Sequence, residues 1–146
     1  MAAMKAAMLM ACLSAVIVSA QGTKNFRARL SPIALDVVMQ ATVAGSGSVT
    51  AALTGTRLAI NGSFDGLKSP ATIAQIHKSP IAGVRGPVMA DLTVSAGTSG
   101  TISGTLTLTP QQLADLEKKR LYIQLHSEKA PDGNLWGWLM PVEGKR

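Results

Sequence analysis

Apolar and polar residues alternate along most of the chain from residue 26 onward. Alternation with a period of two is typical of strands that bury one face and expose the other. The alternating segments are short, and clusters of glycine, proline and serine separate them. About eight short strands with regular turns predict an antiparallel β-sandwich or a β-barrel.

One alternating segment contains the pair Asn61-Gly62, which is typical of a hairpin turn. The apolar positions Leu58, Ile60 and Phe64 nevertheless keep the same parity across this pair. Because a turn would interrupt that parity, we predict one long strand with a kink or bulge at Gly62.

The only helical signal in the pattern begins at Thr109, which is a favourable N-cap residue. Pro110 then occupies the first helical turn, and Leu113 and Leu116 lie on one side of the expected helix. This pattern predicts a short helix that ends near Arg120, directly before the last alternating segments.

The last third of the chain predicts a hairpin made of residues 121–126 and 135–140. The segment Pro131-Asp132-Gly133-Asn134 between them has turn chemistry. The aliphatic faces of the two strands coincide if the numbers of paired residues sum to 260 or 262, and both registers fit this turn. Either register gathers five side chains on the other face, here named the polar-aromatic face: Tyr122, Gln124, His126, Trp136 and Trp138.

Trp136 and Trp138 are the largest side chains of this face, and the sequence leaves two interpretations of them open. Alternate tryptophans on a strand can form a platform for a partner protein or a sugar, because indole offers a large area at low entropic cost. Alternatively, the predicted helix or a loop covers the face, and the tryptophans belong to the core. Each indole N–H would then need an acceptor, and Gln124 is within reach in either register.

His77 and His126 are the two histidines of the chain, and each lies on a predicted strand among polar neighbours. Imidazoles are common ligands of copper and zinc, so the pair suggests a metal site in an oxidising compartment. Two ligands make an incomplete site, which Asp91 or a water would have to complete. The alternative is that both imidazoles form hydrogen bonds with neighbouring groups and stabilise the ends of the sheet.

The first 20 residues have the anatomy of a secretory signal peptide. One cation, Lys5, precedes an apolar run that is too short and wrongly flanked for a membrane span, and the small residues before position 21 fit a cleavage site after Ala20. The segment Leu9–Cys12 resembles a lipoprotein box. The apolar run before Cys12 would be too short for such a signal, so we do not expect a lipid anchor there.

Cleavage after Ala20 would leave 126 of the 146 residues, a single secreted or periplasmic domain spanning residues 21–146. This domain would contain no cysteine, so packing and strand pairing alone would hold it together. Its net charge would be +5, because loss of Lys5 leaves thirteen cations against eight carboxylates. The run at residues 118–120 suits the negative end of the helix dipole. No basic residues interleave with aromatic residues, so we expect no nucleic-acid partner.

Catalytic chemistry has little support in the sequence. The expected domain has no cysteine nucleophile, and Asp91, Asp115 and Asp132 fall on different predicted elements, so they do not form a carboxylate pair. We therefore do not expect an enzyme.

Nine segments, in this order and spacing, resemble those of one known family. They are Phe26–Ser31 (FRARLS), Gly62–Leu67 (GSFDGL), Ala74–His77 (AQIH), Gly86–Val88 (GPV), Asp91-Leu92, Gly104–Thr109 (GTLTLT), Leu121-Tyr122, His126 and Pro131–Gly137. Together they resemble the CHRD domain, a module named for chordin and also found singly in secreted bacterial proteins. The resemblance covers nearly all of residues 25–142.

The resemblance implies an exported, all-β, immunoglobulin-like sandwich without known catalytic activity. In chordin-like proteins such domains belong to extracellular binding proteins. The sequence departs from the family at two places. A common A-H-I-H-G segment has Gln75 and Lys78 here, and a closing G-E-I-R-G-Q segment has Asn134, Trp136 and Trp138. A polar ladder in the family therefore corresponds to an aromatic one here.

From these observations we expect an immunoglobulin-like antiparallel β-sandwich of Greek-key type, with one short helix before the C-terminal hairpin. The expected function is that of an exported binding or accessory module without a cofactor, which presents the polar-aromatic face to an extracytoplasmic protein or glycan. The competing hypothesis is a periplasmic copper- or zinc-binding or redox-associated protein that uses His77 and His126.

Overall fold

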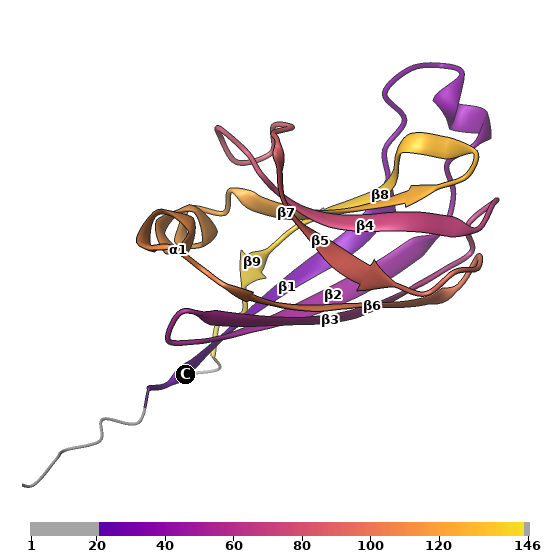
Figure 1. Ribbon diagram of the computed structural model, residues 1–146. Helices are drawn as coiled ribbons and strands as arrows, with labels where there is room; N and C mark the ends of the chain where they lie inside the picture. Colours follow the sequence, from indigo (N-terminus) through magenta and orange to yellow (C-terminus); the bar gives the residue numbers. More distant parts are fainter. Residues whose placement is uncertain (1–20, 145–146) are drawn as a thin grey trace, which may run out of the picture.

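The computed structural model describes residues 21–144, so the predicted signal peptide and Cys12 lie outside the described residues. Within this range the chain forms short strands, one 3-10 helix and one α-helix (Figure 1). In chain order the elements are β1 Thr23–Pro32, η1 Met39–Ala41, β2 Ser46–Thr54, β3 Arg57–Asp65, β4 Ala71–Lys78, β5 Val88–Val94, β6 Gly100–Thr107, α1 Pro110–Glu117, β7 Leu121–Ser127, β8 Ala130–Trp138 and β9 Met140–Pro141.

The strands β1 to β8 form a closed, eight-stranded antiparallel barrel (Figure 1). Their order around the barrel is β2-β3-β6-β5-β4-β7-β8-β1, and β1 pairs again with β2, which closes the ring. The short β9 is a third pairing partner of β1, after β2 and β8. The predicted immunoglobulin-like sandwich is therefore wrong, whereas the all-β class and the single short α-helix are confirmed.

Two strands close the barrel because each changes its partner along its length. β1 pairs with β2 up to Leu30, and its last residues, Ser31 and Pro32, pair with β8. β5 pairs with β4 up to Leu92 and with β6 from Thr93. Such strands form corners between two sheets, and the ring closes through these short pairings. A period of two indicates which face of a strand is buried, but it does not indicate where a strand changes partner.

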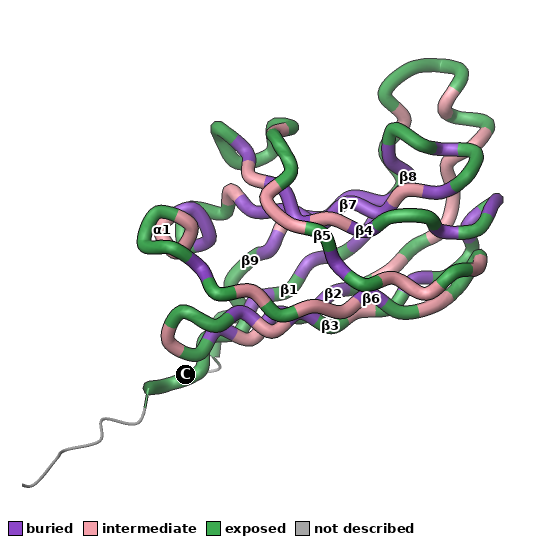
Figure 2. The backbone as a smooth tube through the Cα atoms, in the orientation of Figure 1, coloured by how far each residue is buried: buried purple, intermediate pink, exposed green. Residues whose placement is uncertain are grey.

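The inward-facing side chains form one buried hydrophobic core. Buried and exposed stretches alternate along the backbone of the barrel wall (Figure 2). An eight-stranded barrel is just wide enough for side chains to fill its interior. Every barrel strand contributes to this core, with Phe26, Val49, Ile60, Ile76, Leu92, Ile102, Ile123 and Leu135 as examples. These inward positions are the ones that the alternation predicts. Val88, the first residue of β5, is 50% exposed and lies outside this core.

The predicted kink or bulge at Gly62 is wrong. β3 pairs in unbroken register with β2 on one side and with β6 on the other, through Gly62 itself. A Cβ at this position would lie 2.6 Å from Cγ2 of Val49 on the neighbouring strand. The glycine therefore makes room for a core side chain and does not bend the strand.

The closing hairpin has one of the two predicted registers. Tyr122 pairs with Trp138, so the paired numbers sum to 260. The turn, however, lies at residues 128–129, and the predicted turn Pro131–Asn134 is part of β8. The pairing register shifts near this segment, and Gly133 has a φ of +123°. Turn chemistry here produces a bulge inside a strand, because glycine accepts a backbone conformation that disturbs the regular ladder.

The helix begins as the sequence predicts. Thr109 Oγ1 accepts a hydrogen bond from Gln112 N at 3.2 Å, and Thr109 N donates to Gln112 Oε1 at 2.9 Å, which completes a capping box. The helix ends at Glu117, before the predicted end near Arg120, and Lys119 follows with a φ of +60°. Within residues 21–144, no helix has the length and apolar character needed to cross a membrane.

Candidate functional site

The polar-aromatic face lies on the outside of the barrel wall formed by β7 and β8, and His77 of β4 joins it. The ring of Tyr122 stacks on that of His77 with 4.8 Å between centroids. It also lies 5.7 Å from the ring of Trp136 and 4.9 Å from that of Trp138. Here we call these four residues, His77, Tyr122, Trp136 and Trp138, the aromatic cluster. The structure therefore brings together three residues of the predicted polar-aromatic face and His77, which the sequence suggested as a metal ligand.

A loop covers the aromatic cluster. This loop, residues 79–87, connects β4 to β5 and is here named the β4–β5 loop. The Tyr122 hydroxyl donates to Gly86 O and accepts from Gly86 N, both at 3.0 Å. The Arg85 guanidinium lies 4.9 Å from the ring centre of Trp136. Tyr122 is only 1% exposed and Trp136 only 2%. Of the two open interpretations, the structure supports the covered face, and the β4–β5 loop supplies these contacts.

Trp138 lies at the margin of the cluster and is half-buried. Its Nε1 donates to Ser79 Oγ at 3.2 Å, which ties the start of the β4–β5 loop to β8. The sequence suggested Gln124 as the acceptor for an indole N–H. Gln124 Nε2 donates to Asp132 O at 2.8 Å, and neither indole N–H bonds to Gln124 in the described residues, so that suggestion is wrong. Nε1 of Trp136 is buried and has no hydrogen-bond partner within residues 21–144.

The two histidines are oriented in the same way. Nδ1 of His77 lies 3.0 Å from Gly86 O, and Nδ1 of His126 lies 2.7 Å from Pro131 O. A carbonyl oxygen only accepts hydrogen bonds, so each Nδ1 carries a proton, and in the neutral form of either ring Nε2 has the free lone pair. Both Nε2 atoms are buried and lack a partner among the described residues. The expectation that the imidazoles contact neighbouring backbone is thus met for both.

Burial lowers the pKa of His77 below 6.5, since desolvation disfavours the charged imidazolium. The hydrogen bond to Gly86 O raises this pKa, whereas the charges of His126 and Arg85 lower it. Desolvation is the largest of these effects, so His77 is mostly neutral at pH 7. Neutral imidazole is also the form that binds metals.

No group of three His, Cys, Asp or Glu residues lies together within residues 21–144 in a way that could hold a metal ion. Asp91, the carboxylate that the sequence suggested as a third ligand, accepts a hydrogen bond from Gln75 Nε2 at 2.9 Å on the paired strand β4. The described residues thus offer two free imidazole nitrogens as metal ligands and no complete set.

Sequence reasoning missed a group of cations at the base of the β4–β5 loop. Lys78, Arg85 and Arg120 line a cavity of about 470 Å³ together with Pro80, Gly86 and Pro87. On the other side of the loop, Trp138 and Met140 line a second cavity of about 360 Å³. The run at residues 118–120 was interpreted only as the end of a helix. Arg85 stands alone in its loop, so no sequence pattern indicated it.

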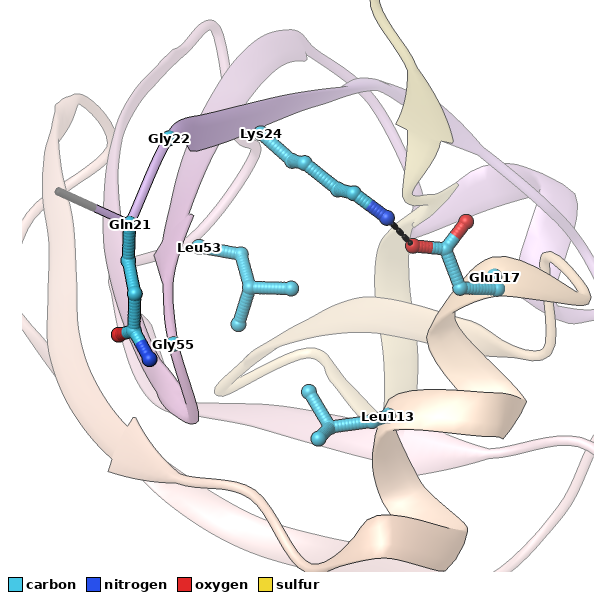
Figure 3. A pocket seen from close by; sticks show the side chains of 7 residues that line it. All are labelled: Gln21, Gly22, Lys24, Leu53, Gly55, Leu113 and Glu117. Atoms are coloured by element: carbon cyan, nitrogen blue, oxygen red, sulfur yellow. Dashed lines mark hydrogen bonds and ion pairs between the residues drawn. The ribbon is translucent and has the colours of Figure 1, made fainter. Parts of the chain in front are cut away.

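A third cavity, of about 360 Å³, lies where the beginning of β1 faces α1 (Figure 3). Leu53 and Leu113 form its apolar part. Its two charged residues neutralise each other, because Lys24 Nζ and Glu117 Oε1 are 2.7 Å apart. This cavity therefore has no excess charge with which to select a ligand.

Comparison with known proteins gives one family. A family model described as the CHRD domain matches residues 26–139. The match begins within β1 and ends directly after β8, so it covers most of β1 and all of β2 to β8. No curated protein and no solved structure matches the chain.

Proposed function

Because the chain belongs to the CHRD family, we propose that it is an exported binding module whose partner docks on the β4–β5 loop. The family match supports a binding-type module outside the cytoplasm, in agreement with the signal-like residues 1–20. The partner class that we propose is an extracytoplasmic protein.

The observation that carries this proposal is the attachment of the β4–β5 loop to the aromatic cluster. Tyr122 forms two hydrogen bonds with Gly86 near the end of the loop, and Trp138 holds Ser79 at its start. A loop that is attached at both ends loses little conformational freedom when a partner binds. The polar-aromatic face then acts as the support of the binding surface, and only its margin contacts the partner directly.

The middle of the loop has the character of a contact surface. Ile81 is 66% exposed and Val84 is 47% exposed, and Met140, beside the loop, is 44% exposed. Exposed aliphatic side chains on a fixed loop suit burial against a protein. They do not suit a sugar, which prefers the open face of an aromatic ring, and Trp136 is covered here. The geometry therefore favours a protein over a glycan.

The test is affinity capture from the extracytoplasmic fraction of the source organism, with residues 21–146 immobilised. We expect the double variant Ile81→Ser/Val84→Ser to lose the partner that the unchanged domain retains. The matched control is Val37→Ser/Val38→Ser, because these valines are 80% and 78% exposed on the loop between β1 and β2. That loop lies at the other end of the barrel (Figure 1).

Retention of the partner by the loop variant, or equal loss in both double variants, contradicts docking on the β4–β5 loop. Circular dichroism melts of both variants check that the barrel is intact. Substitutions of exposed side chains change the free energy of unfolding by less than about 0.5 kcal/mol, so both variants are expected to fold.

A second candidate function is copper or zinc binding by His77 and His126. One observation favours it: both Nδ1 atoms contact backbone carbonyls, and both Nε2 atoms are free. A hydrogen bond from the other ring nitrogen to a carbonyl is the usual orientation of a metal-bound imidazole. Additional ligands would have to come from water or from the partner.

Tryptophan fluorescence tests the metal hypothesis. A copper(II) ion bound at His77 or His126 would lie near Trp136 and Trp138 and should quench their emission. Saturable quenching that disappears in His126→Ala supports the site, and a zinc(II) titration shows whether the site accepts both metals. A flat copper titration of residues 21–146 rules it out.

A further inference from the structure

The cavity at the base of the β4–β5 loop gathers three cations from separate parts of the chain. Lys78 ends β4, Arg85 lies in the loop, and Arg120 precedes β7. Two backbone hydrogen bonds hold these segments in place: Ser79 N donates to Arg120 O at 2.7 Å, and Lys78 N donates to Pro87 O at 3.0 Å. The fold thus holds together the backbone segments that carry the three cations.

One buried carboxylate orders two of these cations. Asp115 of α1 is fully buried, with Oδ2 3.0 Å from Lys78 Nζ and Oδ1 3.7 Å from Arg120 Nη1. Arg85 forms no ion pair within the described residues and instead stacks on Trp136. Three cations and one carboxylate leave a net charge of +2 at the cavity. The cavity beside Lys24 differs, because its single cation is neutralised by Glu117.

We propose that this cavity binds a small organic oxyanion, with a phosphate monoester as the best match. The two excess positive charges match a dianion, and guanidinium groups form paired hydrogen bonds with the oxygens of phosphate or carboxylate. Pro80 and Pro87 line the same cavity and supply an apolar surface for the organic part. A volume of about 470 Å³ is within the range of small-molecule sites.

This site is distinct from the exposed tip of the loop. Lys78 and Arg120 belong to the barrel end and not to the loop, and Ile81 and Val84 do not line the cavity. Anion binding and partner docking can therefore be separated by substitution. The loop is shared by both, so a bound anion at Arg85 would also stabilise the surface proposed for the partner.

The experiment is isothermal titration calorimetry of residues 21–146 with phenyl phosphate at low salt. We expect saturable binding that weakens about tenfold or more in Arg85→Gln, because this variant loses a charge-assisted hydrogen bond to the anion. The matched control is Lys119→Gln, which removes one positive charge next to Arg120. Lys119 itself lines the second cavity, beside Trp138 and Met140. We expect this variant to weaken binding by less than about twofold, since an exposed charge outside the site is screened.

Three further titrations identify the chemistry. Inorganic phosphate should bind more weakly than phenyl phosphate. Equal affinities would contradict the proposal that the apolar part of the cavity binds the organic group. Benzoate should also bind more weakly than phenyl phosphate, because it carries one negative charge. Tighter binding of benzoate would contradict the proposed preference for a dianion. Benzyl alcohol, which has no charge, should give no heat of binding.

Absence of binding to the unchanged domain, or equal loss in Arg85→Gln and Lys119→Gln, overturns the proposal. Ile81→Ser/Val84→Ser should bind phenyl phosphate with unchanged affinity, even if it loses a protein partner. A failure of partner docking can thus be told apart from a failure of the anion site. Trp136 emission gives an independent readout, since Arg85 lies over its ring.

Discussion

The hairpins β2–β3 and β7–β8 belong to the same barrel, yet they are buried in different ways. Along β2 and β3 only alternate residues are buried, and outward residues such as Thr50 and Asn61 are exposed. Along β7, Tyr122 and Gln124 are buried on the outer face, and Ile123 is buried on the inner one. The second hairpin is therefore a middle layer between the barrel core and the β4–β5 loop.

The difference shows how one alternating pattern leads to two environments. Both hairpins place aliphatic side chains inward, and both place polar or aromatic side chains outward. The outward side chains of β7–β8 are large and aromatic, so leaving them in water would be costly. A loop that covers them removes this cost and is itself ordered. The four predictions below test that distinction, beginning with the largest effect.

The outer faces of the two hairpins should respond very differently to truncation. We expect Trp136→Ala to lower the free energy of unfolding by about 3–5 kcal/mol, because it removes a buried aromatic side chain and leaves a cavity. Asn61→Ala, on the exposed face of β3, should change it by less than about 0.5 kcal/mol. Urea denaturation followed by circular dichroism measures both. Similar values for the two variants would show that the loop does not bury Trp136 in solution.

The inner faces should respond alike. Ile123→Ala in β7 and Ile60→Ala in β3 remove the same atoms from positions that are 0% and 1% exposed. We expect each to cost about 2–5 kcal/mol in the free energy of unfolding. A single cooperative transition is expected in both cases, because one barrel core joins the two hairpins. Biphasic unfolding of either variant would contradict a shared core.

A single hydroxyl should matter on one outer face and not on the other. Tyr122→Phe removes both hydrogen bonds to Gly86 and should cost about 1–2 kcal/mol. Thr50→Val removes a 3.3 Å hydrogen bond to Asn61 O on an exposed face and should cost less than about 0.5 kcal/mol. Native-state hydrogen exchange sharpens the comparison, since only Tyr122→Phe should speed exchange of the Gly86 amide. Equal exchange rates would mean that the loop does not depend on Tyr122.

The smallest effect that we expect is a pH dependence of the free energy of unfolding. It comes from His77 on the covered face. The pKa of His77 is lower in the folded protein than 6.5, so the unfolded chain takes up a proton first as the pH falls. The stabilisation from a neutral His77 is complete above pH 6.5 and is lost as the pH falls from there through the lowered pKa. Unfolding free energies at pH 7.5 and pH 5 measure this loss.

The control for this prediction is His77→Asn, whose side-chain amide can still donate to Gly86 O but does not titrate. It should show a smaller loss between the two pH values. The same loss in both proteins would assign the pH dependence to other groups. The β2–β3 hairpin contains no histidine and contributes nothing to this comparison.

The sequence by itself determined the local features. Alternation predicted which side chains enter the core, as for Leu58 and Ile60, because the side-chain period of a strand is a property of the backbone. Matching the two aliphatic faces limited the hairpin register to sums of 260 or 262, and the structure has 260. The N-cap at Thr109 was also predicted, since the start of a helix is a local signal. The family resemblance rested on segments of the same local kind.

Only the tertiary structure decided the closure of the barrel and the composition of the site. Closure depends on the pairing of Ser31 in β1 with β8 and of Thr93 in β5 with β6. The first of these pairings joins residues far apart in the chain. Whether Trp136 is exposed depends on a loop whose own sequence does not indicate where it lies. The cavity of Lys78, Arg85 and Arg120 likewise draws on three segments that only folding brings together. A local pattern specifies the direction of a side chain, whereas its environment is set by contacts that are distant in sequence.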